Sequence, residues 1–205
     1  MIRLEDVGRV EKYLRRCFGL EVAKRLRASS MLVLDSRGGA VYSVPRDRYE
    51  LLKDLGLDPD LVVAAGTHIG WMVEGMFVPS VGLFRLAKSL AGEVRGCAAV
   101  CTEQGVKAFL YGNDILVASI KRVIEPFERG LFVAVIDDVD GEVIGVGLAV
   151  VDSQQIDELR KRGAILEPAI LNVFDLGASI RSEKLFMEIP RDRLKSLYRR
   201  VASRR

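Results

Sequence analysis

The sequence predicts an α+β protein made of two domains and a basic helical extension. Residues 1–93 are expected to form a mixed α/β domain with an antiparallel sheet, residues 94–183 a small β-barrel, and residues 184–205 a helix. Helical and strand patterns alternate through the first domain, whereas strand patterns dominate the second. Between them, residues 91–96 contain two glycines and are less hydrophobic than their flanks, which is typical of a domain boundary.

The first domain is expected to contain two hairpins and several helices. Apolar residues recur at helical spacing over 6–18, and a second short helix follows over 20–27. The next expected elements are strands over 31–34 and 40–44, a helix over 46–55, a strand over 61–65, strands over 69–73 and 76–78, and a helix over 81–90. Gly39 and Gly75 allow the two hairpin turns, and Ser80 is a suitable helix start.

The second domain begins with a short helix that turns sharply into a strand at Ile115-Leu116. The turn is predicted because Gly112 can adopt positive φ and Asn113-Asp114 can hydrogen-bond their own backbone. The expected elements beyond it are a strand around 121–123, strands over 131–136 and 143–151, a helix over 154–162 and an apolar strand over 169–174. Glycines inside a strand, at Gly145 and Gly147, indicate tight bends of a small barrel or close approach of another backbone.

Charge is distributed unevenly along the chain. The net charge is +2 over residues 1–93, −5 over 94–183 and +6 over 184–205. In the tail, Leu194, Leu197 and Val201 form an apolar stripe that is surrounded by cations. This pattern predicts a basic amphipathic helix, which would suit contact with RNA or with a partner protein.

The segment KAFLYGNDIL, which begins at Lys107, is similar to the FLYGN-(H/D)-VL signature of the Nip-seven family of ribosome-biogenesis proteins. Three further segments resemble that family in the same order: AGTHIG at 65–70, GVG at 145–147 and DLGASIRSE at 175–183. The chain therefore resembles an archaeal-type homologue over about residues 9–183. The resemblance implies a pre-PUA domain followed by an RNA-binding PUA domain, and a role in large-subunit ribosome biogenesis or ribosomal RNA processing.

The resemblance also implies an RNA site between the glycine turn, the strand after it and the final strand. On this chain the site would hold Lys107, Gly112, Asn113, Lys121, Arg122, Arg181 and Lys184. Their position in basic clusters adds Arg160, Lys161, Arg191, Arg199 and Arg200. Phe109 and Tyr111 are expected to be core residues rather than base-stacking platforms. The implied partners are ribosomal RNA or its precursor and proteins of ribosome assembly or RNA processing.

No catalytic or metal motif is found, so we expect a non-enzymatic protein without a cofactor. His68 is the only histidine and is expected to be structural, because no Ser or Cys is marked out as its nucleophile. The chain has no P-loop and no G-x-G-x-x-G, and its three cysteines lack the C-x-x-C spacing of a zinc site. The acidic turn over 137–142 lacks the register of a calcium loop.

The chain has no apolar run of the roughly 20 residues that a membrane helix needs, and its start lacks the apolar core of a signal peptide. A cytoplasmic location without a membrane partner is therefore expected. Two alternatives to RNA binding in ribosome biogenesis stay open. The first is a protein adaptor that docks through the basic tail helix. The second is an RNA-modifying enzyme or its accessory subunit.

Overall fold

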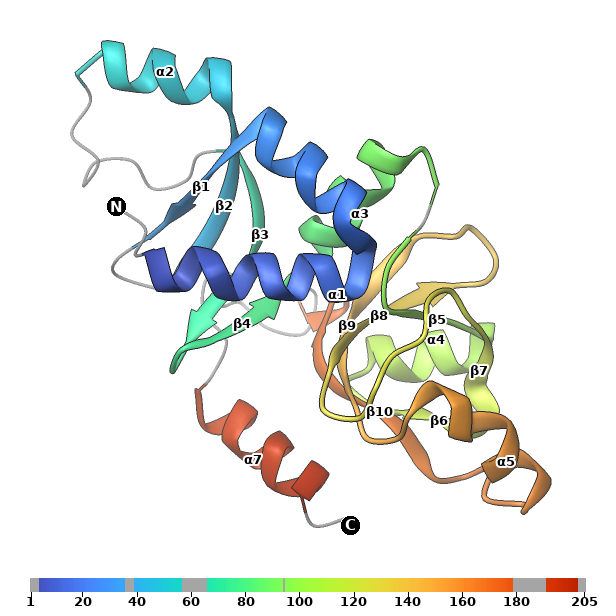
Figure 1. Cartoon of the computed structure of the whole chain (residues 1–205). Helices are drawn as coiled ribbons and strands as arrows, with labels where there is room; N and C mark the ends of the chain where they lie inside the picture. Colours follow the sequence, from blue (N-terminus) through green and yellow to red (C-terminus); the bar gives the residue numbers. More distant parts are fainter. Residues whose placement is uncertain (1–3, 36–38, 57–65, 94, 179–190, 203–205) are drawn as a thin grey trace. The chain divides into compact units, whose positions relative to one another are not determined.

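The computed structural model describes residues 4–35, 39–56, 66–93, 95–178 and 191–202 (Figure 1). The chain divides into two compact units, Met1–Glu93 and Val94–Arg205. Both units combine helices with a β-sheet, and the second ends in a helix, so the predicted α+β class is confirmed. The strand predicted over 61–65 lies outside the described residues.

In its described residues, the first unit has a four-stranded antiparallel sheet and three helices. Its strands pair in the order β1-β2-β3-β4, and both predicted hairpins are confirmed. The elements are α1 (Leu4–Ser29), β1 (Ser30–Leu34), β2 (Ala40–Pro45), α2 (Arg46–Asp54), β3 (Thr67–Val73), β4 (Met76–Pro79) and α3 (Val81–Ala91). A kink at Gly19, with φ of 79°, divides α1 into the two helical segments that the sequence predicts.

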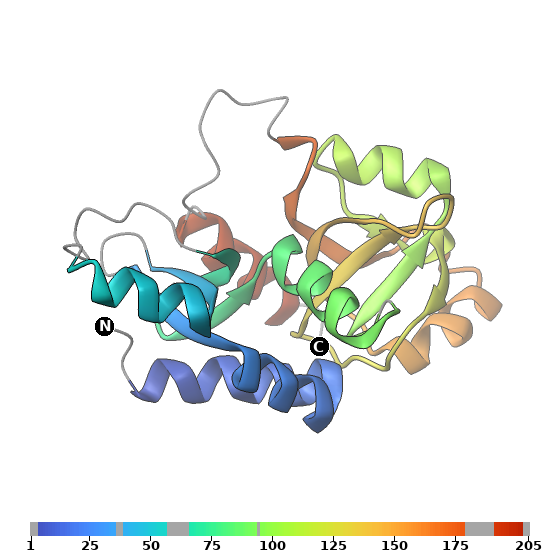
Figure 2. The ribbon, with the colours of Figure 1, turned by 90° about the horizontal axis from the view of Figure 1, so that it is seen from above.

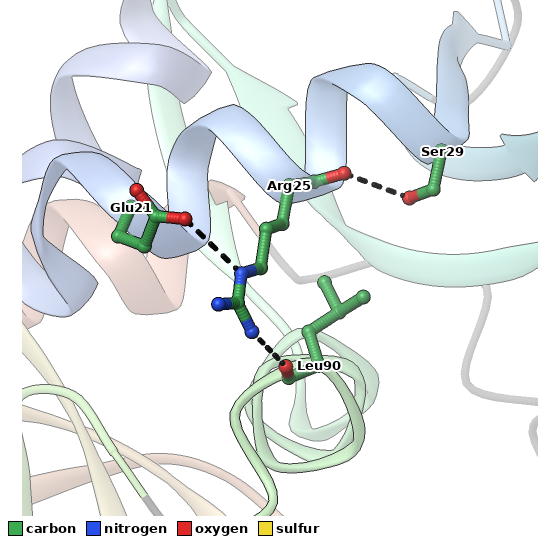
Figure 3. Close-up of polar contacts among 4 residues, drawn as sticks. All are labelled: Glu21, Arg25, Ser29 and Leu90. Carbon is green, nitrogen blue, oxygen red and sulfur yellow. Dashed lines mark hydrogen bonds and ion pairs between the residues drawn. The ribbon is translucent and has the colours of Figure 1, made fainter.

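The helices α1 and α3 contact each other and pack on strands of the sheet. Their contact contains rings from both helices and from β4: Phe18 lies 5.3 Å from Phe84, and Tyr13 lies 5.6 Å from Phe77, between ring centroids. At the end of α3, Arg25 Nη1 donates to the Leu90 carbonyl at 3.2 Å (Figure 3). Because the last carbonyls of a helix lack intrahelical partners, this cation stabilises the end of α3.

The single histidine lies in an aromatic cluster of the first unit. The ring of His68 is 4.3 Å from that of Trp71 and 5.4 Å from that of Tyr42, and its buried Nε2 has no hydrogen-bond partner among the described residues. Burial lowers the pKa of His68, and a hydrogen bond with the Gly70 backbone acts in the opposite direction. The folded unit therefore favours the neutral imidazole.

We expect the first unit to lose stability as the pH falls below about 6.5, the pKa of an unfolded histidine, because the unfolded chain then binds a proton that the folded one resists. The loss of stability should stop once the pH is below the lowered pKa that His68 has in the folded protein. The fluorescence of Trp71, the only tryptophan, should report this in urea titrations between pH 7.5 and 5. His68→Gln, which cannot titrate, should show a smaller pH dependence; an equal dependence would assign the effect to carboxylates.

The second unit is a six-stranded sheet that almost closes into a barrel. The strands pair in the order β6-β10-β9-β8-β5-β7, and all pairs are antiparallel except β5 with β8. Its elements are β5 (Ala98–Cys101), α4 (Glu103–Leu110), β6 (Ile115–Leu116), η2 (Val117–Ser119), β7 (Ile120–Val123), β8 (Phe132–Asp137), β9 (Val143–Ala149), η3 (Ser153–Gln155), α5 (Ile156–Lys161), β10 (Pro168–Asp175) and α7 (Arg191–Ala202).

The short helix η2 joins the two edge strands of this sheet. The strands β6 and β7 lie at opposite edges of the sheet, yet only the three residues of η2 separate them in the chain. The helix α4 lies on one side of the barrel strands, as the view from above shows (Figure 2). The core of the second unit is apolar, and Val133, Val135 and Leu148 are among its fully buried residues.

The glycines of β9 are required by close packing, which confirms the predicted approach of another backbone. A Cβ added to Gly145 would lie 2.4 Å from the Phe174 carbonyl oxygen and 2.6 Å from a ring carbon of Phe109. A Cβ on Gly147 would lie 2.7 Å from the Leu171 carbonyl oxygen. All three distances are shorter than real Cβ contacts, so β9 and β10 can pair in this way only because glycine lacks a side chain.

Candidate nucleic-acid interface

The predicted reversal after α4 is confirmed as a tight, hydrogen-bonded turn. Thr102 caps the N-terminus of the helix, because its hydroxyl accepts a hydrogen bond from the Gly105 backbone N–H at 3.2 Å. At its other end, the Gly112 N–H donates to the Phe109 carbonyl at 2.8 Å, and the Asn113 N–H donates to that of Ala108 at 3.1 Å. Gly112 has φ of 89°, a conformation that glycine adopts without steric cost.

A buried polar network binds this turn to β10. Asn172 and Asp175 are only 2% and 1% exposed. The Asn172 side-chain amide donates to the Phe109 carbonyl at 2.9 Å and to the Asp175 carboxylate at 3.1 Å. The Asn172 backbone N–H donates to Asp114 Oδ1 at 2.9 Å. Polar groups buried this deeply are stabilising only when they are paired, so the network fixes where the turn lies.

The tail helix α7 packs on the same unit and reaches the turn. The predicted apolar stripe of Leu194, Leu197 and Val201 is buried, and the Tyr198 ring lies 6.1 Å from that of Phe132. Arg200 Nη2 forms an ion pair with Asp114 Oδ2 at 2.6 Å. Asp114 therefore connects the turn both to β10 and to the basic helix.

Besides Gly112 and Asn113, three predicted site residues lie at this end of the unit: Lys107 on α4, and Arg199 and Arg200 on α7. Lys107, in the last turn of α4, pairs with Glu103 at 2.6 Å. The hydrogen bond between them raises the pKa of Lys107 and lowers that of Glu103, and both side chains are solvent-exposed. Arg199 is exposed beside Arg200 on α7, and no ion pair of Arg199 occurs among the described residues.

A second group of predicted residues lies around η2. Lys121 and Arg122 are exposed on β7, and Lys121 forms an ion pair with Asp138. On α5, Arg160 pairs with Asp157 at 2.8 Å and donates to the Ile120 carbonyl. Arg160 therefore ties α5 to the start of β7, a structural role that its charge alone does not predict. Its neighbour Lys161 is exposed.

The predicted residues thus form two groups instead of one groove. The N-terminal end of α4 lies at η2, where the Thr102 N–H donates to the Ser119 carbonyl at 2.8 Å. Its C-terminal end carries the glycine turn, and eight residues of helix span about 12 Å. The group around η2 and the group at the turn therefore lie towards opposite ends of α4. Arg181, Lys184 and the side chain of Arg191 lie outside the described parts of the chain.

The structure also reveals residues that sequence reasoning missed. Phe109 is fully buried, as expected, but Tyr111 is 76% exposed, so the expectation of a core tyrosine is wrong. The polar network around Asn172 was not predicted. The sequence does contain one indication of this network. Asn172 interrupts an otherwise apolar strand, and a buried amide must find hydrogen-bond partners inside the fold.

The described residues contain neither a metal-binding cluster nor a membrane-spanning helix. No group of three or more His, Cys, Asp or Glu side chains there is placed to hold a metal ion. No helix within the described ranges has the length and apolar character needed to cross a membrane.

Comparison with known proteins agrees with the barrel of the second unit. Residues 97–184 match the UPF0113 PUA domain. A hypothetical protein from Pyrococcus horikoshii superposes with a TM-score of 0.60 at 16% identity, covering 88% of this chain and 98% of that one. A conserved PUA domain protein from Thermoplasma acidophilum gives a TM-score of 0.50 at 16% identity, covering 86% and 92%. At these identities the likeness concerns the fold alone.

No protein among those curated for function is similar enough to this chain to be matched. The assignment therefore depends on the family match, which covers all six strands of the barrel and the turn after α4. The second unit of this chain contains a PUA domain, which is an RNA-binding fold.

Proposed function

We propose that this chain is a non-enzymatic RNA-binding protein that acts in large-subunit ribosome biogenesis or ribosomal RNA processing. RNA binding is supported by the PUA domain, and the process by the resemblance of KAFLYGNDIL and three further segments to the Nip-seven family. The expected partners are ribosomal RNA or its precursor and proteins of assembly or processing, in the cytoplasm. A non-enzymatic role is supported by the lack of a catalytic motif in the sequence.

The observation that best supports an RNA-contacting surface at the glycine turn is the ion pair between Arg200 and Asp114. It holds a basic helix next to the glycine turn, although the PUA region is itself net acidic. Arg199 stays exposed on that helix and can contact a phosphate. Because non-specific RNA affinity depends mainly on neutralising phosphates, α7 supplies the charge that the PUA domain lacks.

We expect the full chain to bind short RNAs with an affinity that falls as the salt concentration rises. Arg199→Glu should weaken binding and reduce the slope of log affinity against log salt by about 0.7, the contribution of one phosphate contact on a single strand. Fluorescence anisotropy with labelled single-stranded and hairpin RNAs would measure both quantities. Arg48→Glu makes the same charge change at an exposed position of α2 and should leave the slope nearly unchanged.

Other outcomes would redirect the proposal. A loss with Arg122→Glu but none with Arg199→Glu would move the surface to β7. No binding to any RNA at low salt would favour the adaptor alternative, which would then use the exposed cations of α7, because the apolar stripe of that helix is already buried. Turnover of ribosomal or transfer RNA would contradict the non-enzymatic assignment.

A further inference from the structure

Tyr111 is the most exposed of the large hydrophobic side chains in the described structure. It is 76% exposed, although the adjoining helix residue Phe109 is fully buried. Tyrosine occurs both in cores and on surfaces, so the exposure of this ring gains meaning only from the turn that carries it. Tyr111 lies at the C-terminal end of α4, directly before Gly112, and thus inside the PUA turn.

The backbone that carries this ring is rigidly held. The Tyr111 N–H donates to the Ala108 carbonyl at 3.1 Å. Asn172 also holds the chain on both sides of Tyr111. Its side-chain amide donates to the Phe109 carbonyl, and its backbone N–H donates to the Asp114 carboxylate. A tyrosine side chain has only two torsions, so a ring on such a support loses little entropy when a ligand covers it.

The neighbours of Tyr111 fit a nucleotide better than a protein. Gly112 and Asn113 are exposed and supply no further large apolar surface, whereas the centre of a protein interface is apolar. Lys107 is four residues earlier on α4, so the two side chains lie on the same face, roughly 6 Å apart at their Cβ atoms. The side chains of Lys107 and Glu103 are 68% and 65% exposed, so their ion pair is weak and a phosphate can replace the carboxylate.

We infer that Tyr111 is a stacking platform for one unpaired base of an RNA, with Lys107 contacting an adjacent phosphate. This inference rests on the proposed function and narrows its ligand to single-stranded RNA. In a duplex the faces of the bases are covered by their neighbours, whereas in loops and ends they are open to aromatic side chains. The ring and the cation together match the two parts of a nucleotide, its base and its charge.

The test compares Tyr111→Ala, Tyr111→Phe and Lys107→Ala in the full chain, using a single-stranded ten-nucleotide RNA and a blunt duplex of the same sequence. Tyr111→Ala should weaken single-strand binding by about 5- to 100-fold, the range for loss of one base stack. Its salt slope should not change, because no cation is removed. Tyr111→Phe should bind within about threefold of the unaltered protein, since its ring keeps the π-face. Lys107→Ala should reduce the slope by about 0.7.

Leu166→Ala is the matched control, because Leu166 is another apolar side chain of the second unit with 74% exposure. It should leave binding unchanged, and urea unfolding of all variants should show that their stability is unaffected. Unchanged affinity of Tyr111→Ala, with intact salt-dependent binding by the unaltered protein, would overturn this inference and leave the proposed function standing. An equal loss on the duplex would also overturn it. No binding by the unaltered protein would overturn the proposed function itself.

Discussion

Replacing Gly145 by alanine is expected to destabilise the second unit by about 3 kcal/mol, at the upper end of the usual cost of overpacking a core. The added Cβ would lie 2.4 Å from the Phe174 carbonyl oxygen and 2.9 Å from the Asp175 Cα, and these backbone atoms belong to a paired strand that cannot move aside locally. It would also lie 2.6 Å from the Phe109 ring, which is buried beneath the glycine turn. RNA binding should therefore fall together with stability.

Amide hydrogen exchange can measure the stability of each unit separately, whereas a global unfolding curve cannot. Protection in β8, β9 and β10 should fall markedly in Gly145→Ala, while that of β1 to β4 stays the same. Gly8→Ala is the control substitution, since its Cβ would meet nothing within 4 Å in α1. That variant should be neutral or slightly more stable, because alanine favours a helix by about 0.5–1 kcal/mol over glycine. Unchanged protection of β9 in Gly145→Ala would contradict the packing argument.

Asn172→Ala is the second change with a large expected effect, a loss of about 3 kcal/mol in the stability of the second unit. The substitution removes one hydrogen bond to the Phe109 carbonyl and one to the buried Asp175 carboxylate. A hydrogen bond typically contributes about 0.5–1.5 kcal/mol, and one to a charged group about 1.5–3 kcal/mol. Asn172→Leu should be similarly harmful although it keeps the volume, because it removes the same two hydrogen bonds. Chemical denaturation followed by circular dichroism would measure both losses.

Asn113→Ala provides a comparison within the same turn. The Asn113 amide donates to the Ala108 carbonyl at 3.1 Å, but the residue is exposed, so water can replace the bond. Its loss should cost about 1 kcal/mol or less. If Asn172→Ala were no more harmful than Asn113→Ala, the buried network would not be what holds the turn on β10.

The sequence predicted those parts of the fold that depend on local patterns. Hairpin turns were found at glycines with positive φ, such as Gly75 at 77°, and the helix α4 with its sharp reversal was found from Gly112. The start of α3 at Val81 was also predicted, but for the wrong reason. Ser80 does not cap the helix with its side chain; its hydroxyl donates to the His68 carbonyl at 2.8 Å instead.

The parts that the sequence did not predict depend on contacts between distant residues. The parallel pairing of β5 with β8 brings together strands that are separated by α4 and two further strands, and no periodicity encodes such a pairing. Likewise, the charge of Arg160 is visible in the sequence, but its bond to the Ile120 carbonyl is not. Tyr111 looked like a core residue because aromatic residues are usually buried, and only the geometry of the turn shows that its ring points into solvent.

The supports of the glycine turn come from far along the chain. Asp114 is bonded to Asn172 and to Arg200, which follow it by 58 and 86 residues. During synthesis, the signature KAFLYGNDIL is therefore complete long before the residues that make it rigid have been added. A nascent chain, or one truncated before β10, contains all residues of the motif but lacks the surface that they form in the folded protein. Recognition is thus a property of the finished protein, and a peptide that carries the motif alone should be a poor substitute for it.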